Sequence, residues 1–293
     1  MRRSLQHSAM APFLFILPAL ILVVGITYAG LGYTGWVSTL DWNGLDPEPK
    51  SAGFDNYVRI AGDAVFWRSL RNVAIFGVVT ISVQMALGLV IAVLLSGNRV
   101  VARPFFKVLV FLPVVLAPAA VATAFREIMG PGGFLNSAIA FLGFNSEPIL
   151  WLANPSIAIF SIAMINIWQW TGLSFLLYQA AIAQVDHHLF EAAMLDGAGS
   201  VKTFFYVLIP QLNGTHATLA LLGWIGSLKT FDIVYMTTGG GPARTTEFLT
   251  TYIYRAVILD FQAGYSAALA VVLGALAILL TVIQIRLYRL AEN

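Results

Sequence analysis

Residues 72–98 read NVAIFGVVTISVQMALGLVIAVLLSGN, a run without a single Asp, Glu, Lys or Arg. A helix rises about 1.5 Å per residue and the hydrocarbon core of a bilayer is about 30 Å thick, so roughly 20 apolar residues can cross it. The remainder of the chain is similarly apolar: of 293 residues, 59% are hydrophobic and only 10% are charged, whereas soluble domains carry about 25% charged residues. The mean hydropathy of +0.82 agrees with this composition. The sequence therefore predicts a membrane protein.

Five further runs of comparable length lack charged residues, which gives six predicted spans at about 13–36, 73–95, 106–125, 157–182, 210–231 and 265–288. A seventh run, 128–146, contains GPGG, and we expect an interfacial or partly buried helix there. Pro113 and Pro118 lie inside the third span, so that helix should be kinked and buried among its neighbours. In the external segment after the first span, residues 56–70 can be helical, with apolar residues available to lie against the membrane: Val58, Val65, Phe66 and Leu70.

The predicted fold class is an all-α membrane protein, with a single transmembrane domain over 13–293 after an N-terminal segment, 1–12. The first apolar stretch continues to about Trp36 without a convincing cleavage site, so it is interpreted as a span and not as a signal peptide. Six spans place both termini on one side, and the Lys and Arg counts of the two sides are equal. Short loops carry the positive-inside signal, and the turn SGNRVVARPFFK at 96–107 holds three cations and no acid. Both termini are therefore expected in the cytoplasm.

A charged, glycine-containing segment, FEAAMLDGAGS at 190–200, interrupts the apolar sequence between the fourth and fifth spans. Asp186 can cap a helix over about 187–195. Gly197 or Gly199 can end that helix in a left-handed conformation. The first half of the segment is therefore predicted to be a short helix outside the bilayer.

A second short helix is predicted over about 201–208, with Ser200 as its cap. Pro210 can then occupy the first turn of the fifth span, where its missing N–H costs nothing. The expected result is a cytoplasmic helix–turn–helix, which we call the elbow and define as residues 186–210.

One side of the elbow is apolar and includes small residues, so another protein could approach it closely. The residues predicted on this side are Leu189, Ala192, Ala193, Phe204 and Leu208. Glu191 and Asp196 lie at its rim, positioned to meet cations on a partner. The alternative is that the elbow folds down onto lipid headgroups.

The elbow sequence resembles a known family. EAAMLDG at 191–197, nine intervening residues and VLIP at 207–210 are similar to the EAA loop of permease subunits in binding-protein-dependent ABC importers. The family pattern is Glu-Ala-Ala, three residues, Gly, nine residues and Ile-x-Leu-Pro, and this chain has Val and Ile at the two aliphatic positions. Segments 231–255 and 264–273 resemble the end of the fifth span, the following external loop and the sixth span in the sugar-type branch.

The resemblance implies a permease that imports a sugar or sugar-like solute across the inner membrane of a prokaryote, surrounded by membrane lipid. It implies three partners: a second permease in a heterodimer, a cytoplasmic ATPase dimer that holds ATP and Mg, and an extracytoplasmic solute-binding protein. The residues implied in coupling to the ATPase are Glu191, Ala192, Ala193, Asp196, Gly197, Ser200 and Pro210. The chain itself is expected to be no enzyme and to bind no cofactor, in agreement with the lack of a G-x-x-x-x-G-K-[ST] loop.

An ion-gradient-driven secondary transporter is the alternative function. Such proteins commonly place an ionisable group within a span, but the six runs contain no Asp or Glu. An intramembrane enzyme is disfavoured because the spans hold no H-E-x-x-H or serine motif, and His187–His188 fits the elbow better than a metal site. The net charge of +2 gives no argument for a nucleic acid partner, and the lack of cysteine excludes thiolate chemistry.

Polar and aromatic residues within the fourth and fifth spans are candidates for the solute path: Asn166, Trp168, Gln169, Trp170, Asn213, Thr215, His216 and Thr218. Amide and aromatic side chains suit a sugar, although each of these residues could equally join two helices. TTGGGPAR at 237–244 could offer backbone N–H groups to an anion. The resemblance favours an external loop that meets the solute-binding protein through Gly239, Gly240, Gly241 and Pro242.

Overall fold

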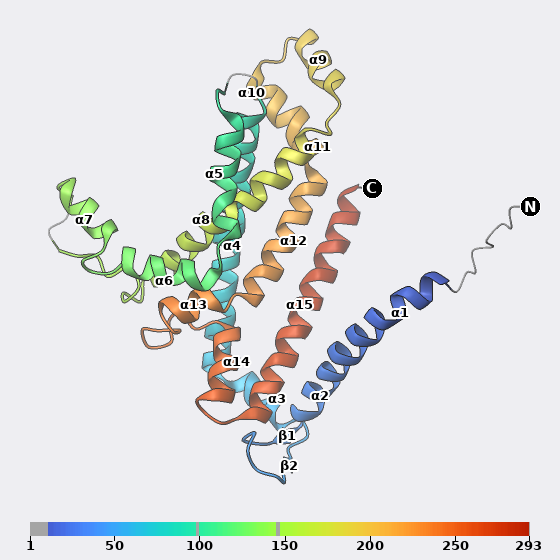
Figure 1. The fold of residues 1–293 in the computed structure, drawn as a ribbon, viewed down its shortest axis with the longest axis vertical. Helices are drawn as coiled ribbons and strands as arrows, with labels where there is room; N and C mark the ends of the chain where they lie inside the picture. Colours follow the sequence, from blue (N-terminus) through green and yellow to red (C-terminus); the bar gives the residue numbers. More distant parts are fainter. Residues whose placement is uncertain (1–10, 98–99, 145–146, 293) are drawn as a thin grey trace, which may run out of the picture. The chain divides into compact units, whose positions relative to one another are not determined.

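The computed structural model of the chain describes residues 11–97, 100–144 and 147–292 and is mostly helical (Figure 1). Two short strands, β1 (Leu40–Asp41) and β2 (Lys50–Ser51), pair antiparallel with Leu40 opposite Ser51. The helices are α1 (Ala11–Val23), α2 (Ala29–Val37), α3 (Asp55–Gly62), α4 (Ala64–Ser96), α5 (Arg103–Val115), α6 (Pro118–Ile128), α7 (Phe134–Phe141), α8 (Ala158–Ile182), α9 (His187–Leu195), α10 (Ser200–Thr203), α11 (Ile209–Gln211), α12 (Asn213–Lys229), α13 (Asp232–Thr237), α14 (Leu249–Ile258) and α15 (Ala263–Glu292). Two short π-helical segments lie in the described ranges, η1 (Val24–Tyr28) and η2 (Phe204–Leu208).

Within the described ranges, four helical segments are long and apolar enough to cross a membrane: Phe15–Val37, Ala64–Ser96, Ala158–Ile182 and Ala263–Tyr288. A fifth candidate is the bent pair α5 and α6. Helix α12 has 17 residues, which at 1.5 Å per residue is about 25 Å and falls short of a full crossing by itself. The N-terminal segment 1–12 lies almost entirely outside the described residues.

The chain divides into two compact units, one comprising the chain up to Gly62 with Ile253–Gly274, the other comprising Asp63–Tyr252 with the chain from Ala275 onwards. In the first unit, Asn56 on α3 is buried and its Nδ2 donates to the carbonyl oxygens of Ser38 at 3.0 Å and Leu40 at 2.9 Å. These bonds hold α3 against the end of α2 and the start of β1.

The second predicted span begins earlier than the sequence analysis expected. Helix α4 starts at Ala64, where the Asp63 side chain accepts a hydrogen bond from the N–H of Val65 at 2.7 Å. The expected continuous helix over 56–70 is therefore interrupted before residue 64, and Phe66 is buried and does not lie on an exposed face. With 33 residues, α4 is about 50 Å long and extends beyond the thickness of a bilayer core.

The third predicted span is broken where a kink was expected. Leu116 and Ala117 are extended. For Ala117 this is expected, because the residue before a proline avoids the helical conformation. Helix α6 restarts at Pro118, and the axes of α5 and α6 differ by 98°. Most of α5 is exposed in this chain, with Pro113 its buried residue, so the expectation that this span is buried among neighbours is wrong for α5.

Small residues let α8 approach both α4 and α5 in the second unit. A Cβ added at Gly88 would lie 2.6 Å from Cβ of Ser174, and one added at Gly172 would lie 2.5 Å from the carbonyl oxygen of Val110. Close backbone approach of this kind is typical of helix packing in membranes, where the hydrophobic effect does not drive association. The glycines therefore set the spacing of the helices around the cavity described below.

Gly172→Ala is expected to destabilise the protein, because the new Cβ would press on backbone atoms of α5 that cannot rotate away. Overpacking typically costs about 1–3 kcal/mol. The measurement is the Tm of the detergent-solubilised protein, with Gly32→Ala on α2 as control, where no described heavy atom lies within 4 Å of the added Cβ. Equal Tm values for Gly172→Ala and the unmodified protein would contradict the packing of α5 on α8.

Candidate functional site

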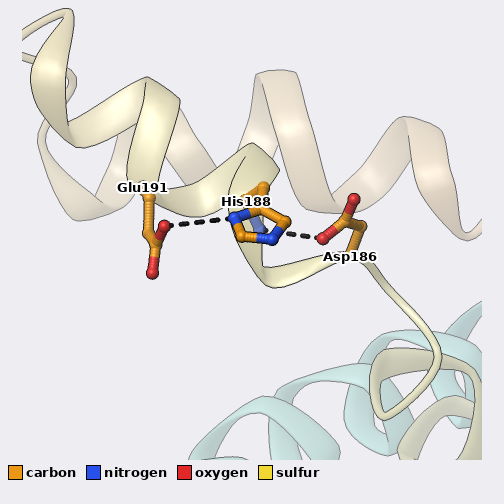
Figure 2. A network of polar contacts seen from close by, with 3 residues as sticks. All are labelled: Asp186, His188 and Glu191. Carbon is orange, nitrogen blue, oxygen red and sulfur yellow. Dashed lines mark hydrogen bonds and ion pairs between the residues drawn. The ribbon is translucent and has the colours of Figure 1, made fainter.

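Helix α9 of the elbow begins with a side-chain cap and carries an exposed carboxylate (Figure 2). Asp186 Oδ1 accepts from the backbone N–H of His188 at 2.9 Å. His188 Nδ1 lies 3.3 Å from Glu191 Oε2, and these side chains are 84% and 65% exposed. An exposed pair of this kind contributes only about 0–1 kcal/mol. Glu191 is therefore available to a stronger cationic partner.

Helix α9 ends in a Schellman motif. The N–H of Gly197 donates to the carbonyl of Met194 at 3.1 Å, and that of Ala198 donates to the carbonyl of Ala193 at 2.9 Å. Gly197 has φ +75°, and among the described atoms nothing lies within 4 Å of a Cβ added there. Glycine is thus needed at this turn for its backbone conformation and not for lack of space.

The second half of the elbow differs from the expectation. Ser200 is the first residue of α10, and the N-cap is Gly199 without a side-chain hydrogen bond, so the assignment of Ser200 as a cap is wrong. Helix α10 continues through η2 into α11, which contains Pro210. The helix breaks at Leu212, and α12 begins at Asn213. Pro210 therefore precedes the helix of the fifth predicted span.

One side of the elbow packs on a buried core. Leu208 of the elbow and Leu212, which follows it, are buried in this core, and Phe190 and Phe204 pack against it. The expectation that Phe204 and Leu208 lie on the outward surface is therefore wrong. Helical periodicity identifies stripes of apolar residues but does not tell which stripe the rest of the protein covers. The core continues into α4 and α8 through buried residues: Leu89, Ala92, Leu95, Phe175 and Tyr178.

The other side of the elbow is exposed and apolar, and we call it the docking surface. Its large side chains are Leu189, Met194, Leu195, Val201, Phe205 and Tyr206. Leu195 is 90% exposed, and Glu191, Ala192 and Asp196 are exposed beside it, whereas Ala193 is half-buried. Exposed apolar patches of this kind mark sites that bind a protein or a membrane. Figure 1 shows α9 and α10 near one end of α4, with α12 leading away from them towards α13.

A cavity of about 330 Å³ lies within the second unit, between α4, α8 and α12 and next to the starts of α6 and α13. This volume is at the lower end of the range of about 300–1,000 Å³ for small-molecule sites. Its polar and aromatic lining residues include Thr80, Gln84, Asn166, Gln169, Trp170, Ser174, Ser227, Lys229, Thr230 and Asp232. The lining thus combines amides, hydroxyls, one cation and one carboxylate.

Side-chain amides form the polar wall of the cavity. Gln84 Nε2 on α4 donates to Asn166 Oδ1 on α8 at 2.9 Å. Gln169 is 1% exposed; its Nε2 donates to the carbonyl of Leu116, at the break between α5 and α6, at 3.0 Å. Its Oε1 has no hydrogen-bond partner in the described part of the chain. A buried acceptor left unpaired is costly, and this one belongs to a side chain that lines the cavity.

Three predicted solute-path residues line this cavity, namely Asn166, Gln169 and Trp170. The others do not: Trp168 packs on Phe125 with ring centroids 5.1 Å apart, and the polar residues at the start of α12 lie outside it, namely Asn213, Thr215, His216 and Thr218. Thr80 and Gln84 also line the cavity and were not among the predicted residues. Their i,i+4 spacing within residues 72–98 places them on one helix face.

The glycine-rich loop after α13 is fixed by buried polar contacts. Asn72 Nδ2 on α4 donates to the carbonyls of Thr245 at 2.9 Å and Glu247 at 3.0 Å. Gly240 is buried with φ +86°, and a Cβ there would lie 2.9 Å from the Glu247 carboxyl carbon. Gly240 therefore shapes the loop and offers no contact surface in this chain, contrary to the expectation.

Gly239, Gly241 and Pro242 are half-buried. Gly241 and Pro242 line a second cavity of about 520 Å³, together with residues from α6 and the segment before α8, among them Arg126, Glu127 and Trp151.

In the described residues no group of three His, Asp or Glu side chains is arranged to hold a metal ion.

The family model for the inner membrane component of binding-protein-dependent transport systems matches residues 84–292. The lactose transport system permease protein LacF of Rhizobium radiobacter is 33% identical over 262 residues, covering 88% of this chain and 87% of LacF. The sulfoquinovosyl glycerol transport system permease protein SmoG of Agrobacterium fabrum is 31% identical over 285 residues, covering 94% of this chain and 89% of SmoG. A crystal structure of a bacterial ABC transporter involved in alginate import shares the fold, with a TM-score of 0.81, 19% identity and 96% of each chain covered.

Proposed function

Because the chain belongs to the family of inner membrane components of binding-protein-dependent transport systems, the permease subunits of ABC importers, we propose that it imports a sugar or sugar-like solute and that its elbow receives the driving force from a separate ATPase. As a permease subunit, the chain is not itself an enzyme. ATP and Mg belong to the partner, and this chain binds no cofactor of its own.

The lining of the first cavity supports a carbohydrate solute. Trp170 offers an aromatic face, and Gln84, Asn166 and Gln169 offer amides that can exchange hydrogen bonds with hydroxyl groups. Relatives named for the transport of lactose and sulfoquinovosyl glycerol point in the same direction. The solute path therefore runs along α4, α8 and α12.

Six spans and a cytoplasmic elbow complete the proposed topology. The four long apolar segments account for four of the spans, and the bent pair α5–α6 is the fifth. The sixth is α12, which α10, η2 and α11 extend on the elbow side. The three cations at 96–107 support a cytoplasmic position for both termini. The elbow then faces the ATPase and the glycine-rich loop faces outwards.

The assembly contains three partners besides lipid. The docking surface meets the ATPase dimer, a second permease completes a heterodimer in the membrane, and an extracytoplasmic solute-binding protein contacts the glycine-rich loop. A relative in fold at 19% identity is described in complex with an alginate pentasaccharide-bound periplasmic protein, which supports the last partner.

The observation that carries the proposal is the two-sided elbow, with Glu191 exposed on one side and Leu208 buried in the core with α4 and α8 on the other. Closure of the ATPase pair moves the docking surface, and the buried side passes the displacement to α4, α8 and α12. The cavity then opens to the opposite side of the membrane.

Glu191→Arg is expected to uncouple the transporter, because a cation replaces the carboxylate offered to the ATPase. Removal of a charge-assisted hydrogen bond costs about 1.5–3 kcal/mol, and the charge reversal adds repulsion. The expected result in proteoliposomes with the ATPase and binding protein is uptake lowered by about ten-fold or more. Glu48→Arg, which reverses an exposed carboxylate outside the elbow, is the control. Unchanged uptake by Glu191→Arg, with the ATPase still copurifying, would contradict the coupling role.

A further inference from the structure

Tyr178 on α8 carries a buried hydroxyl that the transport path described above does not use. The residue is 0% exposed and lies in the core that joins the elbow to α4 and α8. Its hydroxyl has no hydrogen-bond partner among the described residues. Buried polar groups in native proteins are nearly always paired, so an unpaired hydroxyl at this place in the core calls for a physical explanation.

His216 on α12 has the complementary group. Its Nδ1 lies 2.6 Å from the carbonyl oxygen of Leu212. A carbonyl oxygen only accepts, so Nδ1 carries the hydrogen, and in the neutral imidazole Nε2 is then an acceptor. This bond also fixes the ring against the helix break at Leu212, between the end of α11 and the start of α12.

The two side chains already touch across the two helices that the elbow connects. The ring centroids of Tyr178 and His216 are 5.2 Å apart and the rings are inclined at 65°. A donor without a partner on α8 thus lies beside an acceptor on α12. Because α12 starts at a helix break, a rotation of α12 against α8 would change the position of Nε2 relative to the hydroxyl.

We propose that Tyr178 and His216 are positioning residues that form an O–H···Nε2 hydrogen bond when the ATP-bound motor displaces the elbow, and that this bond favours the outward-open state of the cavity. In the present structure this hydrogen bond is not formed. The inference rests on the proposed function, because it requires an ATP-driven displacement of the elbow. Its energetic role is to shift the balance between two transport states, in which a single hydrogen bond changes the populations by about two- to ten-fold.

The natural sequence contains no cysteine, so a single introduced cysteine can report on the cavity. Gly226 lines the cavity, and in the described structure no heavy atom lies within 4 Å of a Cβ added there. With Gly226→Cys in the complete transporter, a membrane-impermeant maleimide added outside measures how far the cavity is open to that side. Labelling of this reporter protein in the vanadate-trapped state should exceed labelling without nucleotide. No nucleotide dependence at all would overturn the proposed function, and this inference with it.

Two conservative changes then test the pair itself. Tyr178→Phe removes only the hydroxyl, and His216→Asn keeps a donor near the position of Nδ1 but lacks Nε2. Each is expected to slow labelling in the trapped state about two- to ten-fold, and the double variant should be no slower than the single ones, because both remove the same bond. Normal labelling in both single variants, or effects that multiply in the double variant, would overturn the proposal while the nucleotide dependence of the reporter remained.

A further readout separates this role from simple packing. Without nucleotide, Tyr178→Phe is expected to have an unchanged or higher Tm, because the variant loses a buried hydroxyl that is unpaired in this state. A lower Tm together with normal trapped-state labelling would assign Tyr178 to packing alone and overturn the proposal.

Discussion

Gly226→Trp is expected to reduce uptake to background while the permease still inserts and binds its ATPase. Gly226 lies on α12 and lines the cavity of about 330 Å³. Within the described structure no heavy atom lies within 4 Å of a Cβ added at this glycine, so the tryptophan side chain is expected to extend into the cavity and obstruct it. The measurement is uptake of labelled solute into proteoliposomes, with ATP hydrolysis recorded in the same samples.

The control for this substitution is Gly226→Ala, which adds one methyl group in the same open space and should retain most of the uptake. Loss of uptake in both variants would point to helix packing and not to obstruction. Full uptake in the tryptophan variant would show that the solute does not pass through this cavity, and would remove the role assigned to Gln169 and Trp170.

Gly197→Val is expected to uncouple ATP hydrolysis from uptake, and to lower uptake almost as much as Gly226→Trp. Gly197 has φ +75°, a conformation that costs an L-residue about 1–2 kcal/mol and is especially unfavourable for a β-branched side chain. The valine variant is therefore expected to lose the Schellman motif that ends α9, and the docking surface would lose its shape. The expected result is continued ATP hydrolysis with strongly reduced solute uptake per ATP.

Gly197→Asn is the matched control, because asparagine tolerates the left-handed conformation. The space around Gly197 is open, so a steric explanation predicts similar defects for both variants, whereas a conformational explanation predicts near-normal coupling for asparagine. Equal loss of coupling in the two variants would contradict the role assigned here to the backbone of Gly197.

The predictable parts of the fold are those with local signals. Charge-free runs located the four long apolar segments, and Asp186 and Gly197 bounded a helix that the structure describes over the same residues, His187–Leu195. The start of α4 was less predictable, because Arg68 and Arg71 end the charge-free run without ending the helix, which begins at its Asp63 cap. Pro113 and Pro118 predicted a kink in the third span, but nothing local in the sequence gives the angle of 98° between α5 and α6.

The candidate site was predictable only where one segment supplies it. The docking surface could not be predicted, because the sequence does not show which apolar stripe of the elbow is covered by α4 and α8. That depends on contacts between residues distant in sequence. The cavity required bringing Gln84 beside Asn166, which lie on different helices. His216 was placed on the solute path because it is polar within an apolar run, yet it contacts Tyr178 outside the cavity.

The unbroken length of α4 has a mechanical consequence. Near its start, Asn72 holds the glycine-rich loop through the carbonyls of Thr245 and Glu247, and near its end Leu95 joins the core on which the elbow rests. These two points are 23 residues apart in the numbering, about 35 Å along one continuous helix. In the proposed importer, α4 thus acts as a lever between the solute-binding protein at one end and the ATPase at the other. A tilt of α4 imposed at either end moves the opposite end as well.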